Sequence, residues 1–493
     1  MRTGSPRATL LGRMQTRARP VGRRGALMAL ALLTGCSSLD SATRSVLGTS
    51  GPAAGQPGYV RGFLGGVVAD EPRAALAGRE VLSSGGTAAD AAVAVGLSLA
   101  VTLPSRAGLG AGGACLAYAA GGRSVNAGAP EAVVFMPIAP APASAPADRP
   151  AAVPMLARGL YLLNARYGTQ RFEERVAAAE ALARFGVPVS RAFAKDLALV
   201  SGPLFADPGA RAVFSRDGAP LTEGQMLRQV DLASTLSQIR VAGVGDFYQG
   251  AMARRIAQVS PEIGGPMGLG DLRGALPKLQ PPLSRAYRND RIAFLPPPAD
   301  GGLATEAAFD VLAGSPDDLA GAAARSMAVL ARYRAGGITP EAVLAARDLP
   351  PALEQVFPAS TSFITLDRNG GAVACVLTMD NLFGTGRIFP GLGFLAAASP
   401  SAVPVPPLAV ALAWNSNLKA FRAAVAGSGQ GAAPEAVAQA MLQTLQTSRP
   451  ARVPVPDPGR VNIVACGQYL PGENSECGWV NDPREPGLAV GAN

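Results

Sequence analysis

The 493-residue sequence contains no histidine. This absence excludes a Ser-His-Asp triad, a Cys-His pair and any zinc or iron site ligated by histidine. We therefore expect neither a metal site nor a cofactor. If the chain is a hydrolase, its general base must be a carboxylate, a lysine, a tyrosine or a free α-amine.

Acidic residues are absent from the first 35 positions, which carry seven arginines. The whole chain has a formal charge of +9, so the remainder carries 9 − 7 = +2. A chain this close to neutral lacks the basic surface that nucleic-acid binding needs, and no nucleic-acid partner is expected. Hydrophobic residues make up 48% of the chain and charged residues 16%, a balance that favours a large buried core over disorder.

The arginine-rich start leads into an apolar run, residues 26–33, that is too short to cross a bilayer. The run ends in Leu-Thr-Gly-Cys at residues 33–36, which fits a bacterial lipobox. We interpret residues 1–36 as a lipoprotein signal peptide with Cys36 as the lipidated residue. The alternative is a signal peptide with a chance cysteine.

The residues after the lipobox predict where the protein is held. Residues 37–58 are rich in Ser, Gly, Ala and Pro, which is typical of a flexible tether. Ser37, in place of an aspartate after Cys36, favours sorting to the outer membrane. We therefore expect a lipid-anchored protein on the periplasmic face of the cell envelope.

Four further cysteines lie in the body of the chain. Cys466 and Cys477 flank a loop containing Gly, Pro and Asn, and in an oxidising compartment we expect them to form a disulfide. The alternative is two free thiols. Cys115 and Cys375 lie in short apolar runs, and we expect them to be buried strand residues with no chemistry.

The body alternates helical and extended patterns. The expected helices cover residues 72–82, 88–99, most of 155–257, most of 313–357, and 434–445. The expected strands are residues 65–69, a stretch around Cys115, and residues 363–367, 372–378, 403–412 and 461–466, followed by a Gly/Pro-rich tail. Helical pairs alternating with hairpins predict stacked α and β layers.

Several short stretches, in this order, resemble the gamma-glutamyltransferase family. They are GGVVA at 65–69, GGTAADAAVA at 85–94, the glycine loop 108–113, GVPVS at 186–190, LRQVDLA at 227–233, DFYQG at 246–250, PPPADGG at 296–302 and DPR at 482–484. The alternative is a chance likeness caused by the Ala/Gly-rich composition. The resemblance implies an α+β fold, the four-layer αββα sandwich of the N-terminal-nucleophile hydrolases. It divides the body into a large-subunit-like region, residues 59–359, and a small-subunit-like region, residues 360–493.

Members of this family cut themselves and expose a threonine at the new N-terminus. That chemistry suits a protein without histidine, because a free α-amine with a pKa near ~8 can deprotonate the hydroxyl of its own residue. The resemblance places Ser360 at the nucleophile and makes the protein two subunits from one precursor, if it is cut. Thr361 is the alternative if the register slips by one residue. A Ser/Thr turn that merely opens a strand is the simpler interpretation of the pattern alone.

Two further features of the family's active site have counterparts here. Thr378 matches the threonine that hydrogen-bonds the nucleophile. Residues 427–431 correspond to a Gly-Ser-Pro-Gly-Gly turn whose adjacent backbone N–H groups form an oxyanion hole. Gln430 and Gly431 would supply those donors, and backbone donors tolerate a change of side chain. An ordinary strand threonine and a plain turn before a helix are the alternatives.

The residues that hold the glutamyl group differ from the family pattern. Asn126 stands where the family has an arginine for the α-carboxylate, and an asparagine cannot form a bidentate, charge-assisted pair. Asp380 replaces an asparagine and would repel a carboxylate. Residues 396–399 replace the acidic cluster that binds the α-amine, and residues 403–407 replace a pair of serines.

These features predict a self-processing hydrolase or acyltransferase with an altered glutamate pocket. Its substrate would be a small molecule with an amide or gamma-glutamyl-type bond. One alternative is a catalytically inactive envelope lipoprotein that uses the same fold as a scaffold or binding module. Another is a working gamma-glutamyltransferase with a rearranged pocket. The hydroxyl at Ser360 favours activity, whereas the altered pocket favours the inactive alternative.

Overall fold

The computed structural model describes residues 63–120, 127–142, 148–352, 359–472 and 477–492. All of these described residues belong to one compact unit. The expected signal peptide, Cys36 and the tether lie outside the described residues. Among the residues that are described, none of the helices combines the length and the apolar character needed to cross a membrane.

The described residues form two large antiparallel sheets. The larger sheet has seven strands in the order β17 (Leu488–Ala492), β1 (Gly65–Ala69), β11 (Ser360–Asp367), β12 (Ala372–Thr378), β2 (Gly112–Tyr118), β3 (Pro130–Phe135) and β8 (Lys278–Gln280). The smaller sheet has six strands in the order β16 (Cys477–Asn481), β15 (Arg460–Leu470), β14 (Ala420–Ser428), β13 (Ala409–Asn415), β10 (Asp290–Phe294) and β9 (Leu283–Tyr287).

The two sheets pack face to face through alternate residues of their strands. Ile364 and Leu366 of β11 join Val410 and Leu412 of β13 in a buried cluster, which we call the inter-sheet core. Phe363, between them on β11, packs on the opposite side of the sheet. This alternation follows from the two-residue period of a β-strand. Each central strand is therefore buried on both faces.

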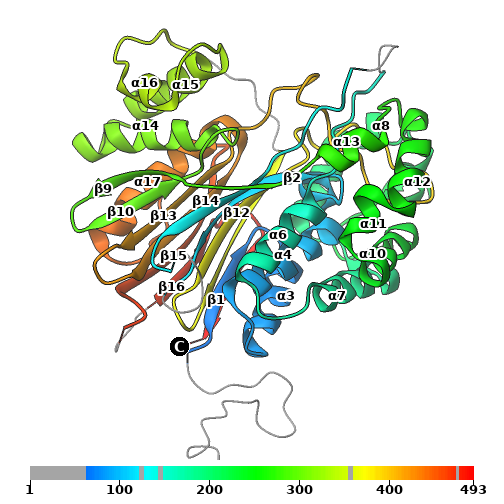
Figure 1. Ribbon diagram of the computed structural model, residues 1–493, viewed down its shortest axis with the longest axis horizontal. Coiled ribbons are helices and arrows are strands. Elements are labelled where there is room, and N and C mark those ends of the chain that lie inside the picture. Colours follow the sequence, from blue (N-terminus) through cyan, green and yellow to red (C-terminus); the bar gives the residue numbers. More distant parts are fainter. Residues whose placement is uncertain (1–62, 121–126, 143–147, 353–358, 473–476, 493) are drawn as a thin grey trace, which may run out of the picture. The chain divides into compact units, whose positions relative to one another are not determined.

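Helices cover the outer face of each sheet (Figure 1). On the larger sheet α3 (Pro72–Ser83), α4 (Ala88–Thr102) and α6 (Leu156–Tyr167) contact the strands, and α7 (Phe172–Phe185) and α10 (Val230–Ala242) pack farther out. On the smaller sheet lie α14 (Gly301–Gly314) and α17 (Ala433–Thr447), with α15 (Leu319–Arg334) and α16 (Pro340–Ala345) beside α14. The expected αββα layering is confirmed.

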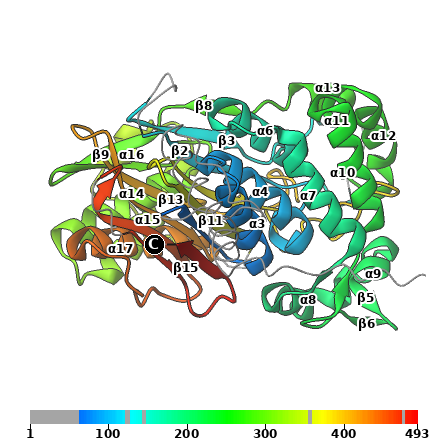
Figure 2. The same cartoon turned by 90° about the horizontal axis from the view of Figure 1, so that it is seen from below.

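The remaining helices extend the layer on the larger sheet away from the smaller one (Figure 2). They are α5 (Pro104–Ala107), α8 (Arg191–Leu204), α9 (Pro208–Phe214), α11 (Val244–Gln249), α12 (Ala251–Val259), the 3-10 turn η1 (Ser260–Ile263) and α13 (Leu269–Gly274). Two short antiparallel pairs lie among them: β4 (Val187–Pro188) with β7 (Met226–Leu227), and β5 (Ser215–Arg216) with β6 (Ala219–Pro220).

Helix α4 shows why this sequence packs as it does. It begins with a capping box between Thr87 and Asp90, and every one of its 15 residues is buried, as its apolar pattern predicts. The Asp90 carboxylate also accepts hydrogen bonds from Asn164 Nδ2 and from the N–H groups of Thr169 and Gln170, each 3.1 Å long. One buried carboxylate thus accepts hydrogen bonds from the first turn of α4 and connects this turn to the chain after α6.

The structure corrects the expectation for Cys115 and Cys375. They form a disulfide that joins β2 to β12, with their Cα atoms 4.1 Å apart. The two residues are directly opposite each other on neighbouring strands, 260 positions apart in sequence. The apolar runs around them predicted burial correctly, but strand order, which brings the sulfurs together, cannot be derived from either run alone.

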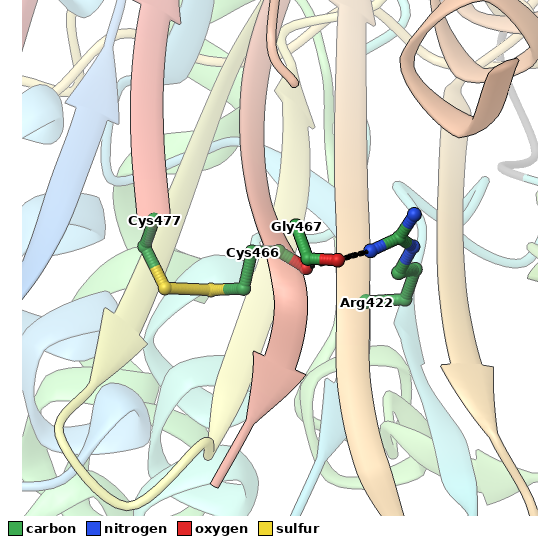
Figure 3. Close-up of a disulfide and its surroundings, with 4 residues drawn as sticks. All are labelled: Arg422, Cys466, Gly467 and Cys477. Atoms are coloured by element: carbon green, nitrogen blue, oxygen red, sulfur yellow. Dashed lines mark hydrogen bonds between the residues drawn. A yellow bond between two sulfur atoms is a disulfide. The ribbon is translucent and has the colours of Figure 1, made fainter. Parts of the chain in front are cut away.

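The C-terminal part of the chain holds a second disulfide, between Cys466 of β15 and Cys477 of β16 (Figure 3). Beside it, the guanidinium of Arg422 on β14 donates to the Gly467 carbonyl. The Gly/Pro-rich tail is more regular than expected, because it adds β16 to the smaller sheet and β17 to the larger one. The strand expected over residues 403–412 begins only at Ala409.

A glycine in α6 tests how tightly this helix packs on the larger sheet. A Cβ added at Gly159 would lie 2.1 Å from the ring of Phe135 in β3, which is itself buried. We expect Gly159→Ala to lower the free energy of unfolding by about 1–3 kcal/mol, because overpacking outweighs a gain of up to ~1 kcal/mol in helix propensity. Urea unfolding followed by circular dichroism measures this change.

The matched control is Gly270→Ala in α13, where an added Cβ meets nothing within 4 Å. This substitution should leave the stability unchanged or raise it by up to ~1 kcal/mol. If Gly159→Ala were as stable as the wild type, the close packing of α6 on β3 would be wrong.

Candidate active site

Ser360 is the first residue of β11 and lies directly opposite Thr378, the last residue of β12. Strand alternation places Ser360 on the same face as Ile364 and Leu366, toward the inter-sheet core. The same argument places Thr378 on the face of Val376. Two candidate residues that are 18 positions apart in sequence are therefore neighbours on one face, and both are buried.

The carbonyl of Ala359 accepts two hydrogen bonds at this point. Thr378 Oγ1 donates to it at 3.0 Å, and the Met379 N–H donates at 3.4 Å. This carbonyl belongs to the peptide bond that precedes Ser360. Donors in this position polarise the carbonyl and stabilise negative charge that develops on its oxygen during nucleophilic attack.

Thr361 lies in different surroundings. Its side chain is on the opposite face of β11, where Thr361 Oγ1 donates to Asp70 Oδ2 at 3.0 Å. It is fully buried. The structure therefore places the hydroxyl of Ser360, and not that of Thr361, beside Thr378.

Asp70, which the sequence analysis did not single out, holds the start of β11. It follows β1, and its carboxylate accepts the Ser362 N–H and Asn462 Nδ2, both at 2.8 Å, besides the Thr361 hydroxyl. Burial raises the pKa of Asp70, while these hydrogen bonds and the charge of Arg106 act in the opposite direction. An acid directly after a buried apolar strand was the available signal.

Arg106 is a second residue that the sequence analysis missed. It is 6% exposed and pairs with Asp196 of α8 through two nitrogens, at 2.8 and 2.7 Å, and with Glu485 of the C-terminal tail at 2.7 Å. These pairs tie α5 to α8 and to the tail. Arg106 is the lone charged residue between Asp90 and Arg123, which could have drawn attention to it.

The expected oxyanion turn follows β14. Gln430 and Gly431 begin the 3-10 turn η2 (Gln430–Ala432), and the first N–H groups of a helical segment have no acceptor within it. Gly429 before them has φ +100°, and a Cβ there would lie 2.2 Å from the Pro458 carbonyl oxygen, so the turn requires glycine.

Ser428 brings the oxyanion turn to the end of the inter-sheet core. It shares the face of Ala424 and Ala426 on β14, and its buried hydroxyl has no hydrogen-bond partner among the described residues. Ser362 Oγ of β11 donates to the Ala426 carbonyl at 3.2 Å, which joins the two sheets here. Two residues beyond this contact, β11 begins at Ser360 and β14 ends at Ser428. The nucleophile candidate and the oxyanion turn therefore lie at the same end of the sandwich.

Asp380 lies two residues after Thr378, in a left-handed conformation with φ +60°. Its N–H donates to Thr378 Oγ1 at 2.8 Å. Its side chain is 3% exposed, and within the described part of the chain neither carboxylate oxygen has a hydrogen-bond partner. Burial raises the pKa of Asp380 well above its ordinary value, opposed by the charge of Arg334. Arg334 itself pairs with Asp300 through two nitrogens, at 2.8 and 3.0 Å.

The other positions at which the sequence departs from the family pattern are only partly described. Residues 396–399 are buried and run beside β12, because the Ala398 N–H donates to the Met379 carbonyl at 3.0 Å. Asn126 lies outside the described residues. In the parts of the chain that are described, no group of three or more Cys, Asp or Glu residues is arranged to hold a metal ion.

Comparison with known proteins adds the family context. A model described as gamma-glutamyltranspeptidase matches residues 74–334. The chain is 33% identical over 261 residues to the glutathione hydrolase proenzyme of Escherichia coli (strain K12), covering 50% of this chain and 44% of that protein. It is 29% identical over 277 residues to the acylase ACY 1 proenzyme of Pseudomonas sp. (strain SE83), covering 51% and 48%. The chain thus spans about half the length of the curated relatives it matches.

A solved structure supports the fold over most of the chain. The crystal structure of cephalosporin acylase from Bacillus halodurans superposes with a TM-score of 0.71 at 18% identity, covering 89% of this chain and 98% of that one. The residues matched by the family model end before Ser360, so the arrangement around β11, β12 and the turn at 429–431 is described by geometry.

The unpartnered carboxyl of Asp380 predicts a pH-dependent difference in stability. Below about pH 3.9 the wild type and Asp380→Asn are both neutral at this position and should unfold with similar free energies. Because burial raises the folded-state pKa of Asp380, the wild type loses stability as the pH rises from about 3.9, where the unfolded chain ionises, toward the folded-state pKa, by about 1.4 kcal/mol per pH unit, and the loss levels off above that pKa. The variant should therefore become the more stable chain, as urea unfolding over a pH series would show.

The control is Asp317→Asn, which removes an exposed carboxyl. Its stability should follow that of the wild type at every pH. A difference between Asp380→Asn and the wild type that stayed constant with pH would contradict the raised pKa.

Proposed function

This chain belongs to the gamma-glutamyltranspeptidase family, and on that premise we propose that it is a self-processing amidase or acyltransferase with Ser360 as its nucleophile. One observation carries the proposal. The Ala359 carbonyl, which precedes Ser360, accepts the Thr378 hydroxyl at 3.0 Å and the Met379 N–H at 3.4 Å. A peptide bond held in this way is prepared for attack by the hydroxyl that follows it.

Self-cleavage would proceed through an ester. Ser360 Oγ attacks the carbonyl carbon of Ala359, the hydroxyl proton passes to the Ser360 nitrogen, and the C–N bond breaks. Ala359 is then esterified to Ser360 Oγ, and Ser360 has a free α-amine. Water hydrolyses the ester, releasing a carboxylate on Ala359 and restoring the hydroxyl. The cleaved protein consists of two fragments, and the second begins at Ser360.

The same residue would then act on substrates. The α-amine of Ser360 takes the proton of its own hydroxyl as Oγ attacks the acyl carbonyl of an amide. The leaving amine receives that proton, and an acyl ester forms on Ser360. Water, or a second amine, attacks the ester and completes hydrolysis or transfer. Gln430 and Gly431 would donate their N–H groups to the developing oxyanion.

The acyl group is where the proposal departs from glutamyl transfer. Asp380 is acidic, residues 396–399 carry no acidic side chain, and position 126 is an asparagine. A gamma-glutamyl group would meet neither a cation for its carboxylate nor the expected acidic cluster for its amine. One relative is named an acylase and another a glutathione hydrolase, so the printed names of the relatives differ in activity. This difference supports an amidase with another specificity.

A second candidate function is a non-catalytic binding module on the same fold. The altered pocket and the unpartnered Asp380 carboxyl favour it, because binding residues of the resembled family are missing. Self-cleavage separates the two candidates, since a scaffold has no need of a free Ser360 α-amine.

We also propose that the protein is exported and held by a lipid on Cys36 at the periplasmic face of the outer membrane. The apolar run at 26–33 and the lipobox at 33–36 support this location. An oxidising compartment also suits a chain with two disulfides.

Self-cleavage can be followed on denaturing, reducing gels with N-terminal sequencing of the products. The wild type should give two fragments, the smaller beginning at Ser360. Ser360→Ala should remain a single chain, because no hydroxyl is available. Thr378→Val should slow cleavage by roughly 100-fold, since it removes a donor to the Ala359 carbonyl.

Thr365→Val is the matched control. It removes a buried hydrogen bond from the same strand, from Thr365 Oγ1 to the Ala88 carbonyl at 2.7 Å, far along β11 from Ser360. This variant should be cut at close to the wild-type rate. A wild-type chain that stayed intact during long incubation would rule out the enzyme and favour the binding module.

A further inference from the structure

Asp380 is a buried acid with an unexplained lack of partners. Both of its oxygens are enclosed without a hydrogen bond among the described residues. A buried polar atom without a partner costs free energy, so its presence requires a reason. Its backbone N–H is bonded to Thr378 Oγ1, which in turn is bonded to the Ala359 carbonyl. Asp380 is thus two hydrogen bonds from the peptide bond that precedes Ser360.

We propose that Asp380 receives a protonated amine of the acyl donor, so that the site takes amine-bearing acyl groups that lack a carboxylate. The inference rests on the proposed function and names its substrate class. An ionised carboxylate only accepts hydrogen bonds, whereas an ammonium group only donates them. An incoming ammonium would supply both oxygens with donors and would pair the charge in a buried place, where such a pair is strong.

The neighbouring residues support an amine over a carboxylate. In the two segments that meet here, residues 379–386 and 395–399, Asp380 is the sole charged side chain. Arg334 is the cation whose charge reaches Asp380, and it is already paired with Asp300 and with the Val405 carbonyl. A carboxylate on the acyl donor would therefore face another acid, and neither segment offers it a cation.

In the uncleaved chain, the Ala359 carbonyl occupies the position beside Thr378. Cleavage would give Ala359 a free carboxylate. The inference requires Ala359 to leave this position after cleavage, so that the acyl carbonyl of a donor can take its place beside Thr378.

Four p-nitroanilides that differ by one group each test the inference on the cleaved wild type. They are the gamma-glutamyl, 4-aminobutyryl, glutaryl and butyryl compounds, which carry both charged groups, the amine alone, the carboxylate alone and neither. We expect the highest kcat/KM for 4-aminobutyryl, at least about 10-fold above butyryl, and the lowest for glutaryl. Asp380→Asn should lower the ratio of 4-aminobutyryl to butyryl at least about 10-fold.

The outcomes separate this inference from the proposed function. Cleaved protein that prefers glutaryl, or an Asp380→Asn variant with an unchanged ratio, overturns the role of Asp380 and leaves the amidase intact. A chain that is neither cut nor active on any of the four overturns both. Asp317→Asn, at an exposed site, should keep the wild-type ratio. Asparagine is close in size to aspartate, and urea unfolding checks that the variant is folded.

The Cys115–Cys375 disulfide carries a second, independent inference. Cys115 lies before the Ala359–Ser360 bond and Cys375 lies after it, and the disulfide between them is fully buried. We infer that the two fragments of the cleaved chain remain covalently joined through this disulfide. The inference also rests on self-cleavage. It implies that β2 and β12 keep their register after cleavage, with Thr378 opposite Gly112.

Gels run with and without reductant test the link, after free thiols are blocked with N-ethylmaleimide. The cleaved wild type should run as one band without dithiothreitol and as two bands with it. The double variant Cys115→Ser/Cys375→Ser should give two bands in both lanes. Cys466→Ser/Cys477→Ser should behave as the wild type, because that disulfide lies within the second fragment.

Each result has one meaning. Two wild-type bands without reductant overturn the covalent link and leave self-cleavage in place. One band in both lanes shows that the chain was not cut, which overturns self-cleavage and the link together. The wild-type lanes alone decide the question if the double variant fails to fold.

Discussion

The candidate site depends on the hydrogen bonds that the carboxylate of Asp70 accepts. It lies at the end of β1 and accepts hydrogen bonds from Thr361 and Ser362 of β11 and from Asn462 of β15. β1 and β11 belong to the larger sheet and β15 to the smaller one, so a single buried group joins both layers. All of its partners are donors, and burying this acid is tolerable only because they are held in place. The position of Ser360, one residue before Thr361, follows from this arrangement.

The layered fold then brings the remaining groups together. Ser360 begins β11, Thr378 ends β12 and Ser428 ends β14, and strand alternation turns all three side chains toward the inter-sheet core. This end of the sandwich therefore collects buried hydroxyl groups from two sheets. In the proposed mechanism the nucleophile and the base come from the same residue, which suits a chain with no histidine.

The electrostatics around these hydroxyls differ from those that a glutamyl group needs. Asp380 adds a buried acid whose pKa is raised, and Arg334, the nearby cation, is already paired with Asp300. Residues 396–399 contribute methyl groups and one hydroxyl in place of carboxylates. The proposed nucleophile and its hydrogen-bond donors thus lie next to a buried acid. This combination is what a change of acyl specificity would produce, because the nucleophile and its donors are largely backbone and hydroxyl groups, independent of pocket charge.

The sequence by itself determined much of this protein. The apolar periods located most of the helices and the central strands, and the ordered short stretches identified the αββα fold. Ser360, Thr378 and residues 427–431 followed from the resemblance, and the positions that depart from the family's glutamate-binding residues could be listed.

Tertiary structure alone decided the rest. Some contacts join residues that are 90 to 392 positions apart in sequence, and no local pattern encodes such separations. They are the Cys115–Cys375 disulfide, the hydrogen bond from Asn462 to Asp70 and the ion pair of Arg106 with Asp196. The edge strands β16 and β17 have weak patterns of their own and form because neighbouring strands offer them backbone hydrogen bonds. The register between β11 and β12 places the Ser360 hydroxyl beside Thr378 and leaves the Thr361 hydroxyl on the other face. The sequence could not fix this register, because a shift of one residue turns every side chain of a strand to its other face.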